Sequence, residues 1–178
     1  MPVDRRHWLG LVAATPLALH AGPTTDARHG RLVVLVRHAE KADDDPRDPT
    51  LSEAGQARAN ALASLLGELP VDQTLVTPLR RTSLTAAPLA KARQLEPTAI
   101  GFGETLDEHI QATRDAVASG SGISVIVGHS NTVPLLVAAL GGPADLLIED
   151  DRYQDLFLLL GVSSAATPWL LRASYGCG

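Results

Sequence analysis

The stretch LVVLVRHAEK at residues 32–41 begins with five consecutive apolar residues and continues directly into Arg37 and His38. A second stretch, ISVIVGHSNT at residues 123–132, repeats this design and continues into Gly128 and His129. Short runs that are rich in β-branched residues and do not alternate are typical of strands buried on both faces of an α/β sheet. Ligands bind at the carboxyl ends of the strands in such sheets. The sequence therefore predicts both histidines at one edge of the sheet, with an arginine beside the first.

The composition limits the class of protein. The chain has 178 residues, which is enough for one domain with a substantial core, and 45% are hydrophobic but only 3% aromatic. The core is therefore expected to consist of Leu, Val and Ala. The formal net charge of −5 argues against non-specific binding of nucleic acid. The single cysteine, Cys177, cannot form an internal disulfide, so it leaves the redox compartment open.

The first 30 residues are predicted to be an export signal and linker, and residues 31–178 the functional domain. Arg5 and Arg6 precede an apolar stretch, residues 8–19, that is too short to span a bilayer as a helix. This arrangement resembles a twin-arginine export signal, with cleavage near Ala21, and implies a periplasmic or secreted protein without a stable membrane span. The alternative is an N-terminal arm that is disordered or packed on the surface.

The rest of the chain alternates between strand and helix patterns. A helix is expected to begin at the cap residue Ser52 and to turn Ala59, Leu62, Leu65 and Leu66 to one face. Alternation of this kind predicts a three-layer α/β/α sandwich around a mostly parallel sheet. Strands are predicted near residues 31–37, 74–77, 98–102, 123–127, 156–160 and 169–173, and helices near 52–66, 78–92, 106–119 and 132–140.

Four segments resemble, in the expected order, the motifs of the histidine phosphatase superfamily, also called the phosphoglycerate-mutase-like family. They are Arg37-His38, Leu51 to Gly55, Thr77 to Ala86, and Gly128 to Ser130. The resemblance covers about residues 31–140. It implies an α/β/α fold and a phosphoric monoester hydrolase of the histidine acid phosphatase type, which uses a phosphohistidine intermediate and needs neither metal nor cofactor.

The resemblance also implies roles for four residues, and each role suits the chemistry. A transferred phosphoryl group carries negative charge on its equatorial oxygens, and the forked donors of Arg37 and Arg81 match that geometry. Arg81 is preferred to Arg80 because of its spacing from Thr77 and Thr85, and adjacent helical residues face different ways. His38 is the expected nucleophile, since a neutral imidazole presents a lone pair to phosphorus. His129 is expected to be the second phosphate-binding histidine.

The proton donor for the leaving group is expected in the loop after residue 100. Glu104 is the preferred candidate, as the family often uses a carboxylate from this loop. Asp107 and Glu108 lie nearby, but they are interpreted as charges at a helix N-terminus.

Other polar residues receive structural interpretations. Glu40 and Lys41 are expected in a solvated loop, with contact to substrate at the rim of the site as the alternative, and His109 is expected on the surface of its helix. Ser130 is interpreted as structural because GHSNT lacks the second glycine of a serine-hydrolase elbow. No His, Cys or Asp spacing resembles a metal site.

Two other functions stay open from the sequence. One is a phosphoglycerate-mutase-type phosphotransferase, although the chain has little material for the insertions that cofactor-dependent mutases carry. The other is a non-catalytic member that binds phosphorylated ligands. The expected partners are a phosphorylated small molecule, a glycan or a phosphoprotein, and not nucleic acid. The oligomeric state and the particular substrate are left open.

Overall fold

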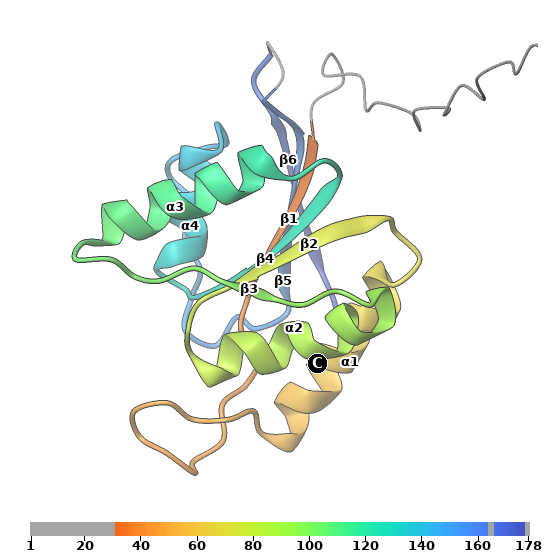
Figure 1. The fold of residues 1–178 in the computed structure, drawn as a ribbon. Coiled ribbons are helices and arrows are strands. Elements are labelled where there is room, and N and C mark those ends of the chain that lie inside the picture. The colour runs from red at the N-terminus through yellow and green to blue at the C-terminus, as the bar shows by residue number, and fades with distance from the viewer. Residues whose placement is uncertain (1–30, 164–165, 177–178) are drawn as a thin grey trace, which may run out of the picture.

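The fold is a three-layer α/β/α sandwich, as the sequence predicts (Figure 1). The computed structural model describes residues 31–163 and 166–176, so the predicted export segment at residues 1–30 and the prediction for Cys177 lie outside the described residues. The elements are β1 (Arg31–Arg37), α1 (Glu53–Leu66), β2 (Val71–Val76), α2 (Arg80–Arg93), β3 (Thr98–Ala99), α3 (Leu106–Ser119), β4 (Ile123–Gly128), α4 (Thr132–Ala139), β5 (Asp155–Val162) and β6 (Trp169–Ser174).

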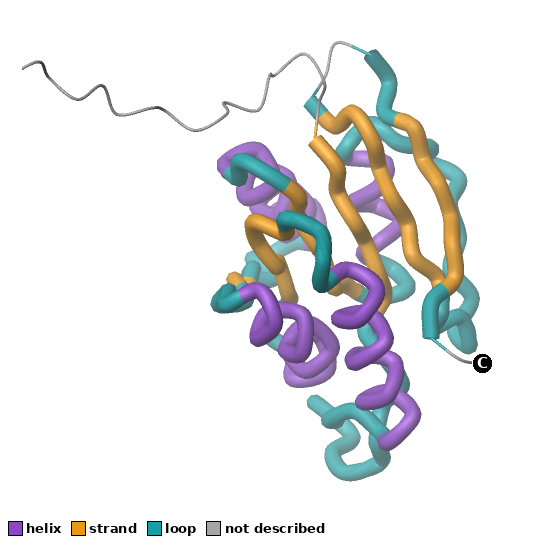
Figure 2. Tube along the Cα trace, turned by 90° about the vertical axis from the view of Figure 1, so that its right-hand side faces the viewer, coloured by secondary structure: helices purple, strands orange, loops and turns teal. Residues whose placement is uncertain are grey.

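The central sheet has six strands in the order β3-β2-β4-β1-β5-β6. The neighbours β3, β2, β4 and β1 pair in parallel, whereas β5 is antiparallel to β1 and β6 is antiparallel to β5. Figure 2 shows the strands side by side with the helices flanking them. The sheet is therefore mostly parallel, and its C-terminal hairpin extends one edge.

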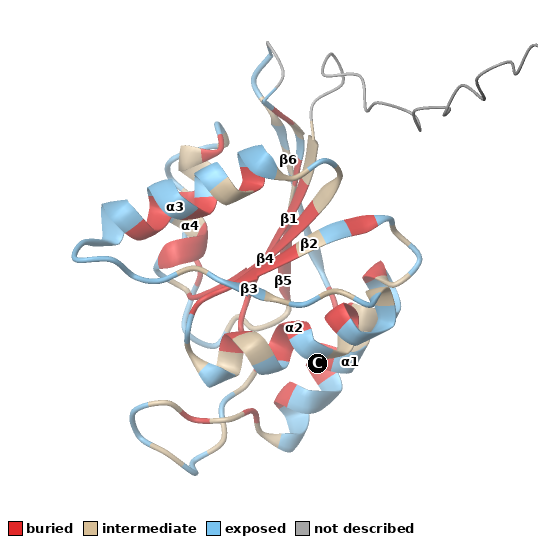
Figure 3. Ribbon diagram, viewed as in Figure 1, coloured by how far each residue is buried: buried red, intermediate tan, exposed pale blue. Residues whose placement is uncertain are grey.

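Strand β1 lies at the centre of the core because both of its faces are covered. Val33 and Leu35 pack in an apolar cluster with α3 and α4, whereas Val34 and Val36 pack in a second cluster with α1 and α2. The buried residues of Figure 3 accordingly run along the central strands. This explains why the sequence of the strand is apolar without alternation.

Side-chain oxygens accept hydrogen bonds from the first backbone amides of α1, α2 and α3. Ser52 accepts a hydrogen bond from the Gly55 amide at 3.1 Å, as expected for the start of α1. Helix α2 has no such cap of its own. Instead, the carboxylate of Asp48, from the 42–50 loop, accepts from the Arg80 amide at 2.9 Å. The loop is thereby tied to the end of the sheet at which α2 begins.

Three details of the predicted elements are wrong. Leu65 is 53% exposed, because the buried side of α1 passes through Ala59, Leu62 and Leu66 and leaves position 65 facing outward. Strand β2 begins at Val71 rather than near residue 74, since Val71 already pairs with Ile123. Strand β3 is limited to two residues, which pair with the end of β2.

None of the helices in the part of the chain that the structure describes is both long enough and apolar enough to cross a membrane.

Candidate active site

The two predicted histidines meet at the carboxyl ends of adjacent strands. Arg37 of β1 pairs with Gly128 of β4, and the His38 amide donates to the Gly128 carbonyl at 2.9 Å. The ring centroids of His38 and His129 lie 5.3 Å apart, edge to face. The geometry confirms that both histidines lie at one edge of the sheet.

His38 is held in one tautomer and kept neutral. Its Nδ1 lies 2.8 Å from the carbonyl oxygen of Ala39, so the neutral ring donates from Nδ1 and leaves a lone pair on Nε2. The side chain is buried, and this burial, with the charges of Arg37 and Arg81, lowers its pKa from 6.5 to about 4. At neutral pH the Nε2 lone pair is therefore available to an electrophile.

His129 is neutral for similar reasons. Burial, together with the nearby His38 and the charge of Arg81, lowers its pKa from 6.5 to about 3. Its Nε2 lies 3.1 Å from the hydroxyl of Thr77, which in turn contacts the hydroxyl of Thr82 at 2.9 Å. The ring is therefore fixed by residues that precede and begin α2.

Arg37 is the last residue of β1 and is almost fully buried. Its Nη1 donates to the carbonyl oxygens of Glu149 and Asp150 at 3.1 and 2.7 Å. The centre of its guanidinium lies 4.1 Å from the ring centroid of Tyr153, a cation–π contact. The 149–153 segment thus holds the arginine beside His38.

Arg81, and not Arg80, is directed toward the histidines. The Arg81 side chain is 17% exposed, lies 3.7 Å from Asp48, and its charge lowers the pKa of both histidines. The Arg80 side chain is 50% exposed and lies 4.0 Å from Asp44. The structure therefore brings together Arg37, His38, Arg81 and His129.

Glu104 lies in the loop that borders this cluster, but its side chain is exposed and forms no hydrogen bond or ion pair with the described residues. The same loop places the Phe102 ring 6.2 Å from the His129 ring. Glu108 accepts from the Glu104 amide at 2.8 Å, and its own amide donates to the cap residue Thr105, so it stabilises the start of α3. Asp107 is exposed in the first turn of that helix, as expected.

The expectations for His109 and Glu40 are wrong. His109 is buried rather than exposed, because it shares the inward side of α3 with Ile110, Thr113 and Val117. Its Nδ1 lies 3.0 Å from the Gly101 carbonyl oxygen, which ties α3 to the loop that carries Phe102.

Glu40 does not lie in a solvated loop. Its carboxylate pairs with Arg58 of α1, with Oε1 2.7 Å from Nη2. Lys41 is exposed, as expected. Ser130 donates to the exposed carboxylate of Asp150 at 3.3 Å, so its hydroxyl is engaged away from the histidine rings.

Two further groups lie beside His38 that the sequence patterns do not predict: the Tyr153 ring and the hydroxyl of Thr85. The Tyr153 ring lies 6.0 Å from the ring of His38, and the Thr85 hydroxyl accepts from the Ala39 amide at 2.9 Å. Thr85 lies within the Thr77 to Ala86 motif, so the family resemblance is a signal that points to its place near the site. Tyr153 has no such signal, since it is brought in by the turn before β5.

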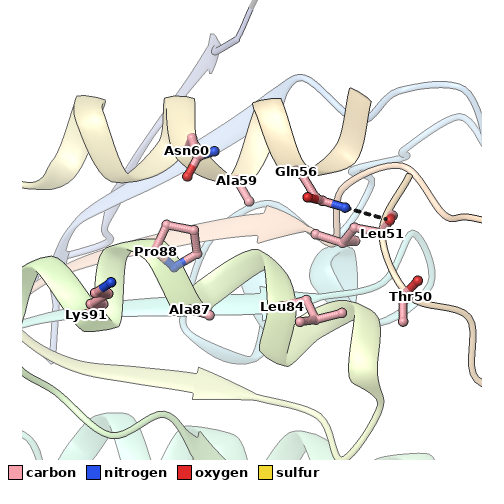
Figure 4. Close-up of a pocket in the computed structure, with 9 residues that line it drawn as sticks. All are labelled: Thr50, Leu51, Gln56, Ala59, Asn60, Leu84, Ala87, Pro88 and Lys91. Atoms are coloured by element: carbon pink, nitrogen blue, oxygen red, sulfur yellow. Dashed lines mark hydrogen bonds between the residues drawn. The ribbon is translucent and has the colours of Figure 1, made fainter. Parts of the chain in front are cut away.

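Two hollows lie near these residues. One, of about 420 Å³, adjoins Tyr153 and is lined by Glu40, Lys41, Ala42, Asp43, Asp45, Pro46 and Pro49. The other, of about 590 Å³, lies between α1 and α2 (Figure 4) and is lined by none of the arginines and histidines of the site. The first hollow is not lined by those four residues either, but its Tyr153 has its ring 6.0 Å from the ring of His38.

Among residues 31–163 and 166–176, no group of three His, Cys, Asp or Glu side chains is arranged to hold a metal ion.

Comparison with known proteins agrees with this geometry. The family model of the histidine phosphatase superfamily (branch 1) matches residues 33–109, a range that contains Arg37, His38 and Arg81. Phosphoserine phosphatase 1 of Hydrogenobacter thermophilus is 41% identical over 71 residues, or 36% of this chain. The match spans about a third of the length of that relative (33%).

Solved structures share the fold over most of the chain. The mycobacterial glucosyl-3-phosphoglycerate phosphatase in complex with VO3 superposes with a TM-score of 0.60 at 17% identity, covering 84% of this chain and 100% of that one. The protein histidine phosphatase SixA complexed with tungstate gives a TM-score of 0.59 at 16% identity, with 79% and 96% coverage. Over residues 33–109 the chain is therefore similar in sequence to the histidine phosphatase superfamily, and over most of its length it shares the fold of these solved structures.

The lowered pKa values predict how the protein responds to acid. The folded pKa values of about 4 for His38 and about 3 for His129 lie below the ordinary 6.5, so the unfolded chain binds more protons between these limits. The free energy of unfolding should therefore fall as the pH drops from 6.5 toward 3. In ¹⁵N NMR spectra both rings should stay neutral at pH ~5.5, where an ordinary histidine is about nine-tenths protonated. Titration of either ring with a midpoint near the ordinary value of 6.5 would contradict the lowered pKa values.

The two adjacent arginines should differ in their effect on anion binding. Arg81→Ala should weaken the binding of vanadate by ~3 kcal/mol, on the order of 100-fold, because it removes a charged donor from a buried site. Arg80→Ala should leave the affinity nearly unchanged, since its side chain is half exposed and faces Asp44. Isothermal titration calorimetry of both variants measures the difference, and a larger loss for Arg80→Ala would refute the assignment.

Proposed function

We propose that the protein is a metal-independent phosphomonoester hydrolase that works through a phosphohistidine on His38. The observation that carries this proposal is a pair of neutral histidines between two arginines, with the Nε2 lone pair of His38 left free by the Nδ1 contact to Ala39. Neutral imidazole is the nucleophilic form of histidine, and arginine is the side chain best matched to phosphate oxygens.

The reaction takes place in two displacements. His38 Nε2 attacks phosphorus, so that a P–N bond forms while the P–O bond to the leaving group breaks. Arg37 and Arg81 stabilise the charge on the equatorial oxygens, and His129 binds the transferred group by a hydrogen bond. Water then attacks phosphorus, the P–N bond breaks, and phosphate leaves with His38 restored.

The charged site supports the binding of a dianion. The Nε atoms of Arg37 and Arg81 are buried donors without an acceptor in the part of the chain that the structure describes. Unpaired buried donors are uncommon and are expected where a bound ion completes the hydrogen bonds. Similar folds have been solved with tungstate and with VO3, anions that resemble phosphate in size and charge.

Glu104 is the proposed acid that protonates the leaving oxygen. Its loop borders His129 through Phe102, and its carboxylate has no other partner among the described residues, so it is free to turn toward a substrate. The hollow beside Tyr153, whose ring lies 6.0 Å from the ring of His38, is the proposed place for the leaving group.

The relatives define the substrates to test first. Their names refer to phosphoserine, phosphorylated histidine in proteins and glucosyl-3-phosphoglycerate. These are all phosphorylated small molecules or side chains, and a panel of the three with an aryl phosphate would define the class of substrate.

The central prediction concerns His38. His38→Ala should abolish turnover and the acid-labile phosphoenzyme that forms with an aryl phosphate, because no other side chain in the site has a lone pair set free in the same way. His109→Gln is the matched control, since it removes a buried histidine that lies outside the proposed reaction centre; it should keep the phosphoenzyme. Activity should also survive EDTA, because the two arginines supply the positive charge.

Two results would contradict this mechanism. One is His38→Ala with a substantial fraction of the wild-type rate, and the other is activity that depends on added Zn²⁺ or Mg²⁺. Tight binding of phosphate without any turnover of the panel would instead indicate a non-catalytic member of the family.

The leaving group provides the test of Glu104. Glu104→Gln should slow the hydrolysis of alkyl phosphates far more than that of aryl phosphates, because a good leaving group departs without protonation. Asp107→Asn is the control, since it removes a nearby exposed carboxylate. Equal slowing of alkyl and aryl substrates would show that Glu104 is not the acid.

We further propose that the protein is exported, on the basis of Arg5-Arg6 and the short apolar stretch that follows. Replacing both arginines with lysine should leave the precursor inside the cell, whereas the wild-type form recovered outside the cytoplasm should begin near Gly22. N-terminal sequencing and fractionation measure both. A full-length chain found solely in the cytoplasm would refute export and leave the catalytic proposal unchanged.

A further inference from the structure

An ion pair between Glu40 and Arg58 lies close to the proposed nucleophile in the chain. Glu40 is two residues after His38, and its carboxylate receives three hydrogen bonds from Arg58 of α1, at 2.7, 2.9 and 3.0 Å. The Arg58 side chain is 9% exposed and that of Glu40 is 22% exposed. Forked arginine–carboxylate pairs of this geometry are stronger and more directional than ordinary surface pairs.

Arg58 is itself anchored in the interior. Its Nη1 donates to the carbonyl oxygen of Tyr175 at 2.8 Å, and its guanidinium lies 5.8 Å from the Tyr175 ring. Although burial by itself raises the pKa of Glu40, the hydrogen bonds from Arg58 hold that pKa below its ordinary value. The carboxylate is therefore charged, and α1 fixes its position.

The backbone around Glu40 is fixed from both sides. The Ala39 amide donates to the Thr85 hydroxyl at 2.9 Å, and the Glu40 carbonyl accepts from the Ser52 amide at 3.0 Å. Gly55 packs so tightly on this backbone that a Cβ at its position would lie 2.2 Å from the Glu40 oxygen. These contacts hold the two flanking peptides, and the Glu40 side chain leaves the backbone at the Cα that ends the Ala39–Glu40 peptide.

This peptide carries the carbonyl that selects the tautomer of His38. The Ala39 oxygen lies 2.8 Å from Nδ1, so its direction decides which ring nitrogen bears the proton. Rotation of the Ala39–Glu40 peptide would remove this acceptor, and the Nε2–H form would then compete.

We infer that Glu40 and Arg58 are positioning residues whose ion pair directs the Ala39 carbonyl at His38 and so keeps the Nε2 lone pair free. The inference rests on the proposed function for its effect on catalysis, whereas its effect on the tautomer is independent of any activity.

The test is the tautomer of His38 in long-range ¹H–¹⁵N NMR spectra of the full chain. The wild type should show the Nδ1–H form. Glu40→Gln and Arg58→Met should each add a measurable Nε2–H population and lower kcat ~10- to 100-fold with little change in KM. Glu53→Gln is the matched control, because it removes an exposed carboxylate from the first turn of the same helix and should change neither quantity.

The double variant Glu40→Gln/Arg58→Met adds a second criterion. If the pair acts as a unit, its loss in kcat should be close to that of either single variant rather than their product. Glu40→Gln keeps one acceptor for Arg58, so it should fold even where Arg58→Met is destabilised, and thermal unfolding checks both.

The outcomes separate this inference from the proposed function. A folded Glu40→Gln protein whose His38 remains wholly in the Nδ1–H form overturns the positioning role, whatever its stability. If the Glu40→Gln and Arg58→Met variants show the tautomer shift but the wild type turns over no phosphomonoester, the proposed function is overturned and the positioning role stands.

Discussion

The parallel pairing of β1 with β4 is the constraint on which the site depends. The register sets Arg37 opposite Gly128, and the His38 amide bonds to the Gly128 carbonyl. Because each strand ends at the same level, the next residue on each is a histidine facing the same space. A shift of one residue in this pairing would separate the two rings. The apolar residues that bury both strands therefore also determine the geometry of the two histidines.

Burial has an electrostatic cost that a bound anion can offset. Two arginines lie beside two histidines, and burial lowers the pKa of both imidazoles, so they stay uncharged while the guanidinium groups stay charged. The carboxylates nearest to these arginines are weak partners. Asp150 is 96% exposed and 4.0 Å from Arg37, and Asp48 is 3.7 Å from Arg81. A phosphate dianion could therefore compete with both for the arginines, even though the whole chain is acidic.

The parts of the fold that sequence predicts are those encoded by local patterns. The run before His38 predicts β1 and the run before His129 predicts β4, and the helix at 106–119 matches α3. The spacing of Arg81 from Thr77 and Thr85 predicts a helix face different from that of Arg80, and the Arg81 side chain is the less exposed of the two; its role in binding phosphate stays a prediction.

The parts that sequence does not predict depend on contacts between distant segments. Arg37 is held by backbone carbonyls at 149 and 150, and any residue supplies a carbonyl, so no side-chain pattern marks them. Tyr153 and Tyr175 reach the site and Arg58 only through the turns on either side of the C-terminal hairpin. The local sequence around Glu40 is that of a loop, and its partner Arg58 comes from α1. His109 is buried because α3 packs on the sheet, which its own segment does not predict.

The position of the phosphoryl group on the trapped enzyme tests the central claim most directly. The Nδ1 contact to Ala39 leaves only Nε2 of His38 free to attack phosphorus. Alkaline quenching during turnover, followed by ³¹P NMR and mass spectrometry of the peptide that contains residue 38, identifies the modified atom. The account predicts a phosphoryl group on Nε2 of His38. A phosphoryl group on Nδ1, on His129 or on a hydroxyl would contradict it.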